Sequence, residues 1–320
     1  MLSSQAVAAH WSRPLAERYM SKHFSTIAVM GNHEDQQALD SVRSLLEHLN
    51  SLGLTVAVSE SLPTNALPGN TPQRTDDLLL DGADLLVAVG GDGTMLRAAR
   101  HAALHGVPLL GINRGRLGFL ADVSPEQMQE SFEQILTGQF RKERRMLLRA
   151  EIYSGDAATA DGLAMNDIVL KNRETGRMLE FQTIVDGQYV NTHGGDGFIA
   201  ATPTGSTAYA LSCGGPIVEP GMEAIVLAPI CPHTLSDRPI VISSQTTIEV
   251  TLTQDDGTRG EVNADGKFVG ELTAGERLNI VAAEQKVDLI HPQGYDYFGT
   301  LRSKLYWGRD TRNRNRRPID

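Results

Sequence analysis

The chain has 320 residues, which is enough for two ordinary domains with a sizeable core. Its formal net charge of -10 argues against general nucleic-acid binding, because such proteins need a basic face. The two cysteines, Cys213 and Cys231, provide neither a disulfide framework nor a zinc pattern, and we expect both to be small buried residues. No apolar run approaches the roughly 20 residues of a membrane span. We expect no nucleic acid and no membrane among the partners.

The two ends of the chain differ in composition from the rest. Residues 1–24 lack the apolar core of a signal peptide, and their basic residues only faintly resemble a transit peptide. We therefore expect a disordered N-terminal extension and a cytoplasmic protein. Residues 309–320 hold five arginines and few apolar groups, which predicts a disordered basic tail.

Strand and helix patterns alternate through the first 112 residues. Strand-like runs occur at 26–30, 54–58, 85–89 and 107–112. Between the first two, six apolar residues fall on one helical face, and Gly53 follows them as a C-cap glycine would. The six are Ala38, Leu39, Val42, Leu45, Leu46 and Leu49. This alternation predicts a mostly parallel, doubly wound sheet of the Rossmann-like kind.

Two further segments of the first half have local signals of their own. Residues 59–77 contain three prolines with several Thr and Asn, which predicts a loop. At 124–127, Ser-Pro-Glu-Gln predicts the start of a helix, with Ser124 as N-cap and Gln127 closing a capping box.

The pattern changes near residue 140. The charge run at 141–145 is most simply a solvated linker or strand edge. After it, helices become rare, and Asp-Gly pairs at 186–187 and 265–266 are typical of hairpins. Strand-like runs lie at 147–153, 168–171, 181–185, 246–252, 278–281 and 286–290. The second domain should therefore be β-rich and sandwich-like.

Residues 90–94, Gly-Gly-Asp-Gly-Thr, are the most informative stretch. They follow the strand-like run at 85–89 and lead into a helix-like run at 95–100. Glycines let a ligand approach the backbone, and a helix N-terminus presents N–H groups to a phosphate. A carboxylate in such a turn would repel a phosphate, so Asp92 makes sense if it meets a hydroxyl or a metal beside the phosphates. This points to chemistry on a nucleotide-like ligand.

Asn166 and Asp167 directly precede the strand-like run at 168–171. Their amide and carboxylate could hold a ribose or a base edge. Taken alone, such a pair is more often an ordinary turn entering a strand.

The segment 194–212 combines a Gly-rich turn, a short apolar strand, a Thr/Ser/Gly run and a short helix-like stretch at 207–212. Small hydroxyls and N–H groups at a helix start suit phosphate or ribose contact, and Tyr209 could stack on a base. The alternative is a Ser/Thr-rich loop with an N-cap, but the clustering of glycines and hydroxyls favours binding.

Other signatures are absent or weak. His233 more simply satisfies a local hydrogen bond, because no nucleophile motif stands near it. The sequence contains no Walker loop, no kinase catalytic set and no clean G-x-G-x-x-G after a strand. An ordinary NAD-dependent oxidoreductase and a P-loop enzyme are therefore not favoured.

Four segments together resemble the NAD kinase family. They are residues 90–94, the Gly-Ile-Asn-Arg-Gly and Leu-Gly-Phe-Leu runs at 111–120, Asn166-Asp167, and Asp196-Gly197 followed by Thr-Pro-Thr-Gly-Ser-Thr-Ala-Tyr at 202–209. The resemblance runs in order from about residue 26 to 308. The first run is shared with lipid kinases and loosely with phosphofructokinases, whereas the last two together are specific to NAD kinases.

The resemblance implies a fold and an activity. It implies an α/β domain at 25–145, a β-rich NAD-binding domain at 146–292, and a C-terminal segment at 293–308 that packs back on the first domain. It also implies a phosphotransferase with an alcohol acceptor, which moves the γ-phosphoryl group of ATP to the 2′-hydroxyl of the adenosine ribose of NAD. A divalent metal, Mg²⁺ or Mn²⁺, would accompany ATP, with no metal ligand assigned to the chain, and the protein would be a homodimer or homotetramer.

The resemblance also implies roles for individual residues. Asp92 would be the general base for the ribose hydroxyl, and Phe119 could pack on the adenine. The residues implied to contact NAD are Asp92, Gly93, Phe119, Asn166, Asp167, Arg177, Gly194, Asp196, Thr207, Ala208, Tyr209, Ala210, Leu211, Ser212 and Lys267.

Two positions depart from the family pattern. Lys267 stands where many bacterial members have Gln, which weakens the role carried to it. Tyr306 stands where the family usually has Gly, and we expect this to affect packing rather than chemistry. The alternatives that remain are a lipid or sugar kinase sharing only the 90–94 turn, and a non-catalytic NAD(P) sensor.

Overall fold

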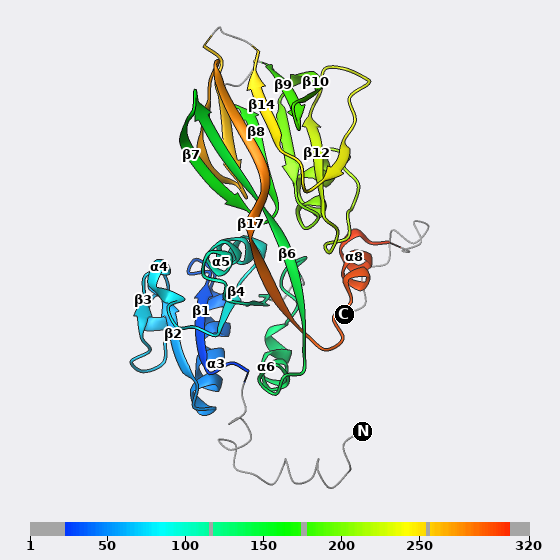
Figure 1. Cartoon of the computed structure of the whole chain (residues 1–320). Helices are drawn as coiled ribbons and strands as arrows, with labels where there is room; N and C mark the ends of the chain where they lie inside the picture. Colours follow the sequence, from blue (N-terminus) through cyan, green and yellow to red (C-terminus); the bar gives the residue numbers. More distant parts are fainter. Residues whose placement is uncertain (1–22, 115–117, 174–177, 254–256, 308–320) are drawn as a thin grey trace. The chain divides into compact units, whose positions relative to one another are not determined.

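The computed structural model describes residues 23–114, 118–173, 178–253 and 257–307, and they form two compact units (Figure 1). Unit 1 takes its described residues from Met1–Met95, Leu109–Lys142 and Ile290–Asp320. Unit 2 takes them from Leu96–Pro108 and Glu143–Leu289. The predicted domain boundaries stay predictions, and the predicted basic tail and nearly all of the N-terminal extension lie outside the described residues. Three elements have residues in both units: α5 (Asp92–His105), β6 (Phe140–Ser154) and β17 (Glu276–Pro292).

Unit 1 contains a parallel sheet with the strand order β5-β4-β1-β2-β3. Its strands are β1 (Thr26–Gly31), β2 (Thr55–Ser59), β3 (Gln73–Arg74), β4 (Leu85–Val89) and β5 (Leu109–Ile112). Ile27 of β1 is in register with Val56 of β2 and Leu85 of β4, so apolar residues of neighbouring strands share a face. The predicted parallel, Rossmann-like sheet is confirmed.

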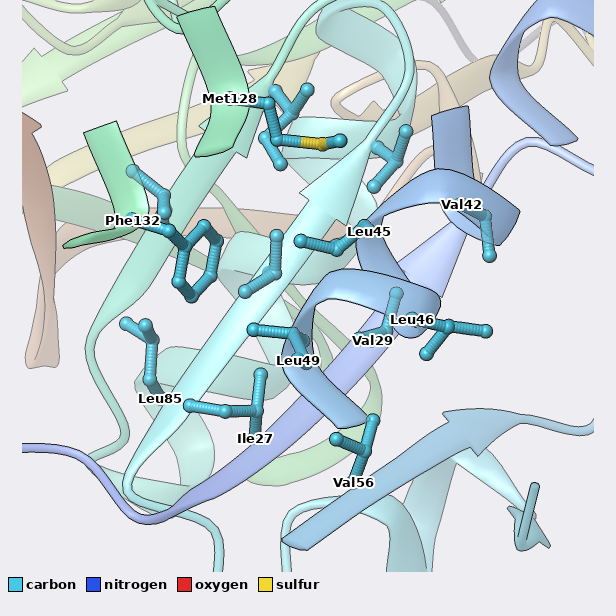
Figure 2. Packing of buried hydrophobic residues seen from close by; sticks show 14 of the residues in the cluster. Ile27, Val29, Val42, Leu45, Leu46, Leu49, Val56, Leu85, Met128 and Phe132 are labelled. Atoms are coloured by element: carbon cyan, nitrogen blue, oxygen red, sulfur yellow. The ribbon is translucent and has the colours of Figure 1, made fainter. Parts of the chain in front are cut away.

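Helix α3 (Gln36–Ser51) packs on one face of this sheet together with α6 (Met128–Leu136) (Figure 2). The helix begins after Asp35, whose carboxylate accepts the N–H groups of Gln37 and Ala38 at 2.9 and 3.3 Å. It ends before Gly53, which takes the left-handed φ of 67° that closes a helix. All six residues of the predicted apolar face are buried, so this helix and its end are confirmed.

Two local predictions in unit 1 are wrong. The predicted loop at 59–77 holds a 3-10 turn η1 (Thr64–Ala66), the short strand β3 and the start of α4 (Asp76–Leu79), because this segment pairs with the edge of β2. The capping box at Ser124 does not form, because its hydroxyl bonds the Glu126 side chain instead of the helix backbone. A 3-10 turn η2 (Pro125–Gln127) therefore precedes α6. The last element of unit 1 is α8 (Tyr297–Leu305).

Unit 2 is built from two sheets. In one, β10, β9, β14 and β17 pair antiparallel in that order, and β6 pairs with β17 and β7. The other is antiparallel with the order β13-β12-β11-β8-β15-β16. The strands are β7 (Ala157–Ala164), β8 (Asp167–Asn172), β9 (Leu179–Val185), β10 (Gln188–Gly195), β11 (Gly197–Ala201), β12 (Ala224–Ile230), β13 (Ile240–Ser243), β14 (Ile248–Leu252), β15 (Gly260–Ala264) and β16 (Lys267–Leu272).

The core of unit 2 lies between these sheets. Phe181 of β9 and Phe198 of β11 meet with ring centroids 5.8 Å apart, which confirms the β-rich, sandwich-like prediction. Both predicted hairpins form, because Asp186-Gly187 and Asp265-Gly266 have the two positive φ angles of a type I′ turn. Among the described residues, no helix is long and apolar enough to cross a membrane.

The charge run at 141–145 is solvated only in part, because Arg141, Lys142 and Arg144 are exposed on a strand as predicted but Arg145 is buried. It lies in β6, and its Arg145 is only 2% exposed. The buried cysteines are a second correction, because Cys213 is half-buried and Cys231 is exposed.

Candidate active site

The turn at residues 90–94 joins β4 to α5 as predicted, and Asp92 is the first residue of the helix. A Cβ on Gly90 would lie 2.4 Å from the Thr94 hydroxyl oxygen, so packing within the turn requires this glycine. A Cβ on Gly91 or Gly93 would meet nothing within 4 Å. Internal packing does not explain these two glycines, whereas the close approach of a ligand to the backbone would.

The Asp92 carboxylate is held by the segment around residues 118–120. Its oxygens accept long hydrogen bonds from the backbone N–H groups of Phe119, at 3.5 Å, and Leu120, at 3.4 Å. A Cβ on Gly118 would lie 2.4 Å from Asp92 Oδ1. The sequence placed Gly118 within a family motif, and only the structure shows that its missing side chain makes room for the carboxylate.

Asp92 faces a cavity of about 370 Å³ in unit 1. Its lining residues are Asp35, Gln37, Gly91, Asp92, Arg114, Gly118 and Lys304. Two opposite charges in the lining, Arg114 and Asp35, form an ion pair. Sequence reasoning missed Asp35 and Lys304, because neither belongs to a motif and both lie far along the chain from residue 92.

In unit 2, the turn containing Asn166 and Asp167 is fixed by Asp265 of the β15–β16 hairpin. The buried Asp265 carboxylate accepts the N–H groups of Met165, Asn166 and Asp167 at 2.9, 2.7 and 3.3 Å. Arg100 of α5 donates to the same carboxylate at 3.3 Å. The sequence marked Asp265 only as a hairpin residue, because its bonds reach residues about a hundred positions away.

The buried carboxylates of Asp167 and Asp265 influence each other. Burial raises the pKa of Asp167 to about 7, the charge of Asp265 adds to the rise, and the backbone N–H of Tyr209 opposes it. Burial also raises the pKa of Asp265, against the opposite effect of its N–H donors and Arg100. Asp265 has the larger set of donors, so we assign the negative charge to it and the shared proton to Asp167 near neutral pH.

The segment at residues 202–207 packs directly on Asn166. A Cβ on Gly205 would lie 2.0 Å from the Asn166 carbonyl oxygen, and the Thr202 N–H donates to the same oxygen at 2.8 Å. The hydroxyls of Thr202 and Ser206 are buried and bond backbone groups. The Thr202 hydroxyl donates to the Met165 carbonyl, and the Ser206 hydroxyl bonds backbone groups of Pro203 and Val218, so both are engaged within the fold.

Arg145 contacts this segment through Thr204, and sequence reasoning missed it. Its guanidinium donates to the Thr204 hydroxyl at 3.0 Å and lies 3.3 Å from the Glu143 carboxylate. The composition of a charge run does not show which of its residues is buried, so no local sequence signal could have identified Arg145.

The other predicted residues of unit 2 lie around α7 (Tyr209–Ser212), which follows a 3-10 turn η3 (Gly205–Thr207). The Asp167 carboxylate accepts the N–H of Tyr209, which brings the Asn166-Asp167 pair to the start of α7. The Tyr209 ring is 44% exposed, whereas Ala210 is fully buried. Thr207, Ala208 and Leu211 are half-buried, and Ser212 is exposed.

Three predicted residues lie on strands and turns of unit 2. The exposed Asp196 accepts a hydrogen bond from the Cys231 thiol, and this bond raises the pKa of that thiol. Gly194 is half-buried and its carbonyl accepts the N–H of His233 at 2.8 Å. Lys267 is exposed at the start of β16. Arg177 lies outside the described residues. Within the described ranges, no group of three or more His, Cys, Asp or Glu could hold a metal ion.

Two family models match most of the chain. The ATP-NAD kinase N-terminal domain matches residues 27–140, and the ATP-NAD kinase C-terminal domain matches residues 165–292. The chain is 42% identical over 286 residues to a protein named NAD kinase from Thiobacillus denitrificans, covering 89% of this chain and 98% of the relative. It is 40% identical over 290 residues to one from Nitrosococcus oceani, covering 91% and 99%.

Two solved structures are similar to the chain. One is an NAD kinase from Archaeoglobus fulgidus in complex with ATP, with a TM-score of 0.67, 29% identity, and coverage of 88% of this chain and 98% of the other. The second is yeast NADH kinase complexed with NADH, with a TM-score of 0.79, 22% identity, and coverage of 92% and 90%. At 22% identity, the second likeness establishes the fold alone.

Proposed function

Since this chain belongs to the NAD kinase family and phosphorylates NAD to NADP, we propose that Asp92 is the general base of the reaction. The observation that carries the proposal is the position of its carboxylate. It lies at the start of α5, beside glycines that packing does not require, and in a cavity of about 370 Å³. The lipid or sugar kinase and the non-catalytic sensor are not favoured.

The chemistry needs a base because a ribose hydroxyl is a weak nucleophile at neutral pH. Asp92 accepts the proton of the 2′-hydroxyl as the hydroxyl oxygen attacks the γ-phosphorus of ATP, and ADP leaves. The open N–H groups of the turn at Gly91 and Gly93 hold the donor phosphates. We assign the divalent cation to the MgATP substrate, because the described residues offer no cluster of metal ligands.

For the dinucleotide, we propose the cluster around Asn166, Asp167 and Tyr209. The support is its rigidity, since Asp265 fixes the Asn166-Asp167 turn and Asp167 in turn caps α7. A protonated Asp167 can donate a hydrogen bond to a ribose oxygen, and the exposed Tyr209 ring can stack on a base. The remaining residues implied by the family resemblance line the same dinucleotide in this proposal.

We also propose a cytoplasmic homo-oligomer. Free cysteines at 213 and 231 suit a reducing compartment. Ile240 and Val241 are exposed apolar residues on β13, an edge strand of unit 2, and they suit a contact between copies of the chain.

The test is NADP formation by purified protein supplied with NAD, ATP and Mg²⁺, measured with an NADP-specific dehydrogenase. We expect the wild type to form NADP. The Asp92→Asn variant should keep its circular dichroism spectrum and melting temperature while kcat falls by about 10²–10⁴-fold. A variant with nearly the wild-type kcat would exclude Asp92 as the base. Folded wild-type protein that forms no NADP would overturn the proposed function itself.

A further inference from the structure

Among the described residues that line the cavity beside Asp92, Lys304 is a cation whose charge is not cancelled by a neighbour. Four ionisable side chains line it: Asp35, Asp92, Arg114 and Lys304. Arg114 and Asp35 neutralise each other in an ion pair. Within the described part of the chain, Lys304 makes no ion pair and no side-chain hydrogen bond. Among the described residues that line this cavity, the Asp92 carboxylate and the Lys304 ammonium are therefore the charges that remain for a ligand.

A simpler explanation for Lys304 is that its charge stabilises the C-terminal end of α8, and Arg302 of the same turn allows this explanation to be tested. A cation in the last turn of a helix interacts with the partial negative charge of the helix C-terminus. Arg302 stands in the same last turn, is 58% exposed, and is ion-paired with Asp296 at 3.0 Å. Arg302 can serve the helix end as well as Lys304, but only Lys304 lines the cavity.

A phosphate group next to Asp92 creates an electrostatic problem that a cation would solve. The donor phosphates and the transferring phosphoryl group are negative, so the ionised Asp92 repels them. A base at this position therefore needs a positive charge on the other side of the phosphate. Lysine suits this need, because its ammonium is a compact charge on a flexible stem with three donors and no acceptor.

We propose that Lys304 binds the phosphate oxygens of ATP beside Asp92 and neutralises charge on the transferring phosphoryl group. In the reaction, a bond forms between the ribose 2′-oxygen and the γ-phosphorus, and the bond from that phosphorus to the β–γ bridging oxygen breaks. The hydroxyl proton goes to Asp92, ADP carries away the electron pair of the broken bond, and Lys304 stays protonated throughout. This inference rests on the proposed function of Asp92, and adds the residue that makes its charge compatible with ATP.

The test compares Lys304→Met, Lys304→Arg and the control Arg302→Met in steady-state kinetics and in calorimetric binding of ATP and NAD. We expect Lys304→Met to lose about 10²-fold in kcat/KM for ATP, the size expected for removing one charge-stabilising donor. ATP binding should weaken, while the Kd for NAD and the melting temperature stay near the wild-type values. Lys304→Arg should recover part of the loss, and Arg302→Met should behave as the wild type.

Three results would overturn the inference. They are unchanged kinetics in Lys304→Met, an equal effect of Arg302→Met, or a loss that follows a lower melting temperature and affects ATP and NAD alike. The last two would leave Lys304 as part of the helix end. Failure of the proposed function is distinguishable, because it would show as absent NADP formation in the wild type or as an active Asp92→Asn variant.

Discussion

Gly118 allows its backbone segment to pass close to the Asp92 carboxylate, because it has no side chain. Because a Cβ there would lie 2.4 Å from Asp92 Oδ1, Gly118→Ala should turn this side chain away. The side chain is short and its end can move, so the melting temperature should change little. The base would be displaced by about an ångström, and such misplacement can cost about 10²-fold in kcat. Kinetics and thermal melting of the variant check this, and a variant with full kcat would show that the close approach is unimportant.

The raised pKa of Asp167 makes stability depend on pH in a definite direction. Its pKa is about 7 in the folded protein and near 3.8 in the unfolded chain, so the folded state binds the proton more tightly. This contribution to stability is complete below pH 3.8 and is lost as pH rises through 7. Above about pH 7, the wild type therefore buries a charged Asp167 beside Asp265.

Removal of this charge should stabilise the protein in alkaline solution. Asp167→Asn should raise the melting temperature relative to the wild type by more at about pH 8.5 than at about pH 5.5, because the amide cannot ionise. The exposed Asp156→Asn serves as the control and should show no such difference between the two pH values. Equal effects of Asp167→Asn at both pH values would contradict the assignment of the shared proton to Asp167.

At the scale of an element, α8 ends in a conformation that its sequence does not favour. Tyr306 caps the helix with φ 57° and ψ 30°, which is the left-handed region. The left-handed conformation costs residues other than glycine about 1–2 kcal/mol. In this structure the departure stands at the C-cap of α8, and the expectation that it affects packing rather than chemistry stays a prediction.

Replacement by glycine should stabilise the protein. We expect Tyr306→Gly to raise the free energy of unfolding by about 1 kcal/mol. Glycine removes the cost of the left-handed conformation, but its greater conformational entropy in the unfolded chain offsets part of the gain. Tyr306→Ala removes the ring but keeps Cβ, so it should give no such gain. Urea denaturation of the three proteins measures the difference. Equal stability of the glycine and alanine variants would show that the backbone conformation is not the cause.

Local sequence patterns predicted elements well where the determinants are close together. The helix at 36–51 has its cap, apolar face and closing glycine within one segment, and both Asp-Gly hairpins depend on two adjacent residues. The charge run at 141–145 was interpreted correctly only in part, because composition does not show that Arg145 is buried while Arg141 and Arg144 are exposed. In β6, Arg145 lies inward and holds Thr204 of a segment 59 residues later.

At the scale of the whole molecule, the edge strand β13 leaves apolar side chains in solvent. Ile240 and Val241 are 40% and 47% exposed, and Leu235 in the preceding segment is 94% exposed. β13 stands at the end of its sheet, where unpaired backbone groups and apolar side chains favour pairing with another chain. This surface supports the proposed contact between copies of the chain.

A charge on this edge should disrupt the oligomer. We expect the wild type to elute above the 34.7 kDa of one chain in size-exclusion chromatography with light scattering, and Val241→Glu to shift toward that mass. Leu78→Glu, on an exposed apolar residue of α4, is the matched control and should leave the mass unchanged. A wild-type mass of one chain, or an unchanged Val241→Glu assembly, would contradict the assignment.

The sequence by itself determined the α/β and β-rich architectures, the family and the Asp92 turn. Periodicity, hairpin pairs and motifs depend on residues that are adjacent or close in the chain. Only the tertiary structure decided what surrounds these motifs. Gly118 beside Asp92, Asp265 on the Asn166 turn, and Lys304 in the cavity are contacts between residues far apart in the chain. The packing of strands and helices sets such contacts, and no local propensity or spacing encodes them. The motifs therefore identify the reaction, and the tertiary fold brings distant residues into contact with them.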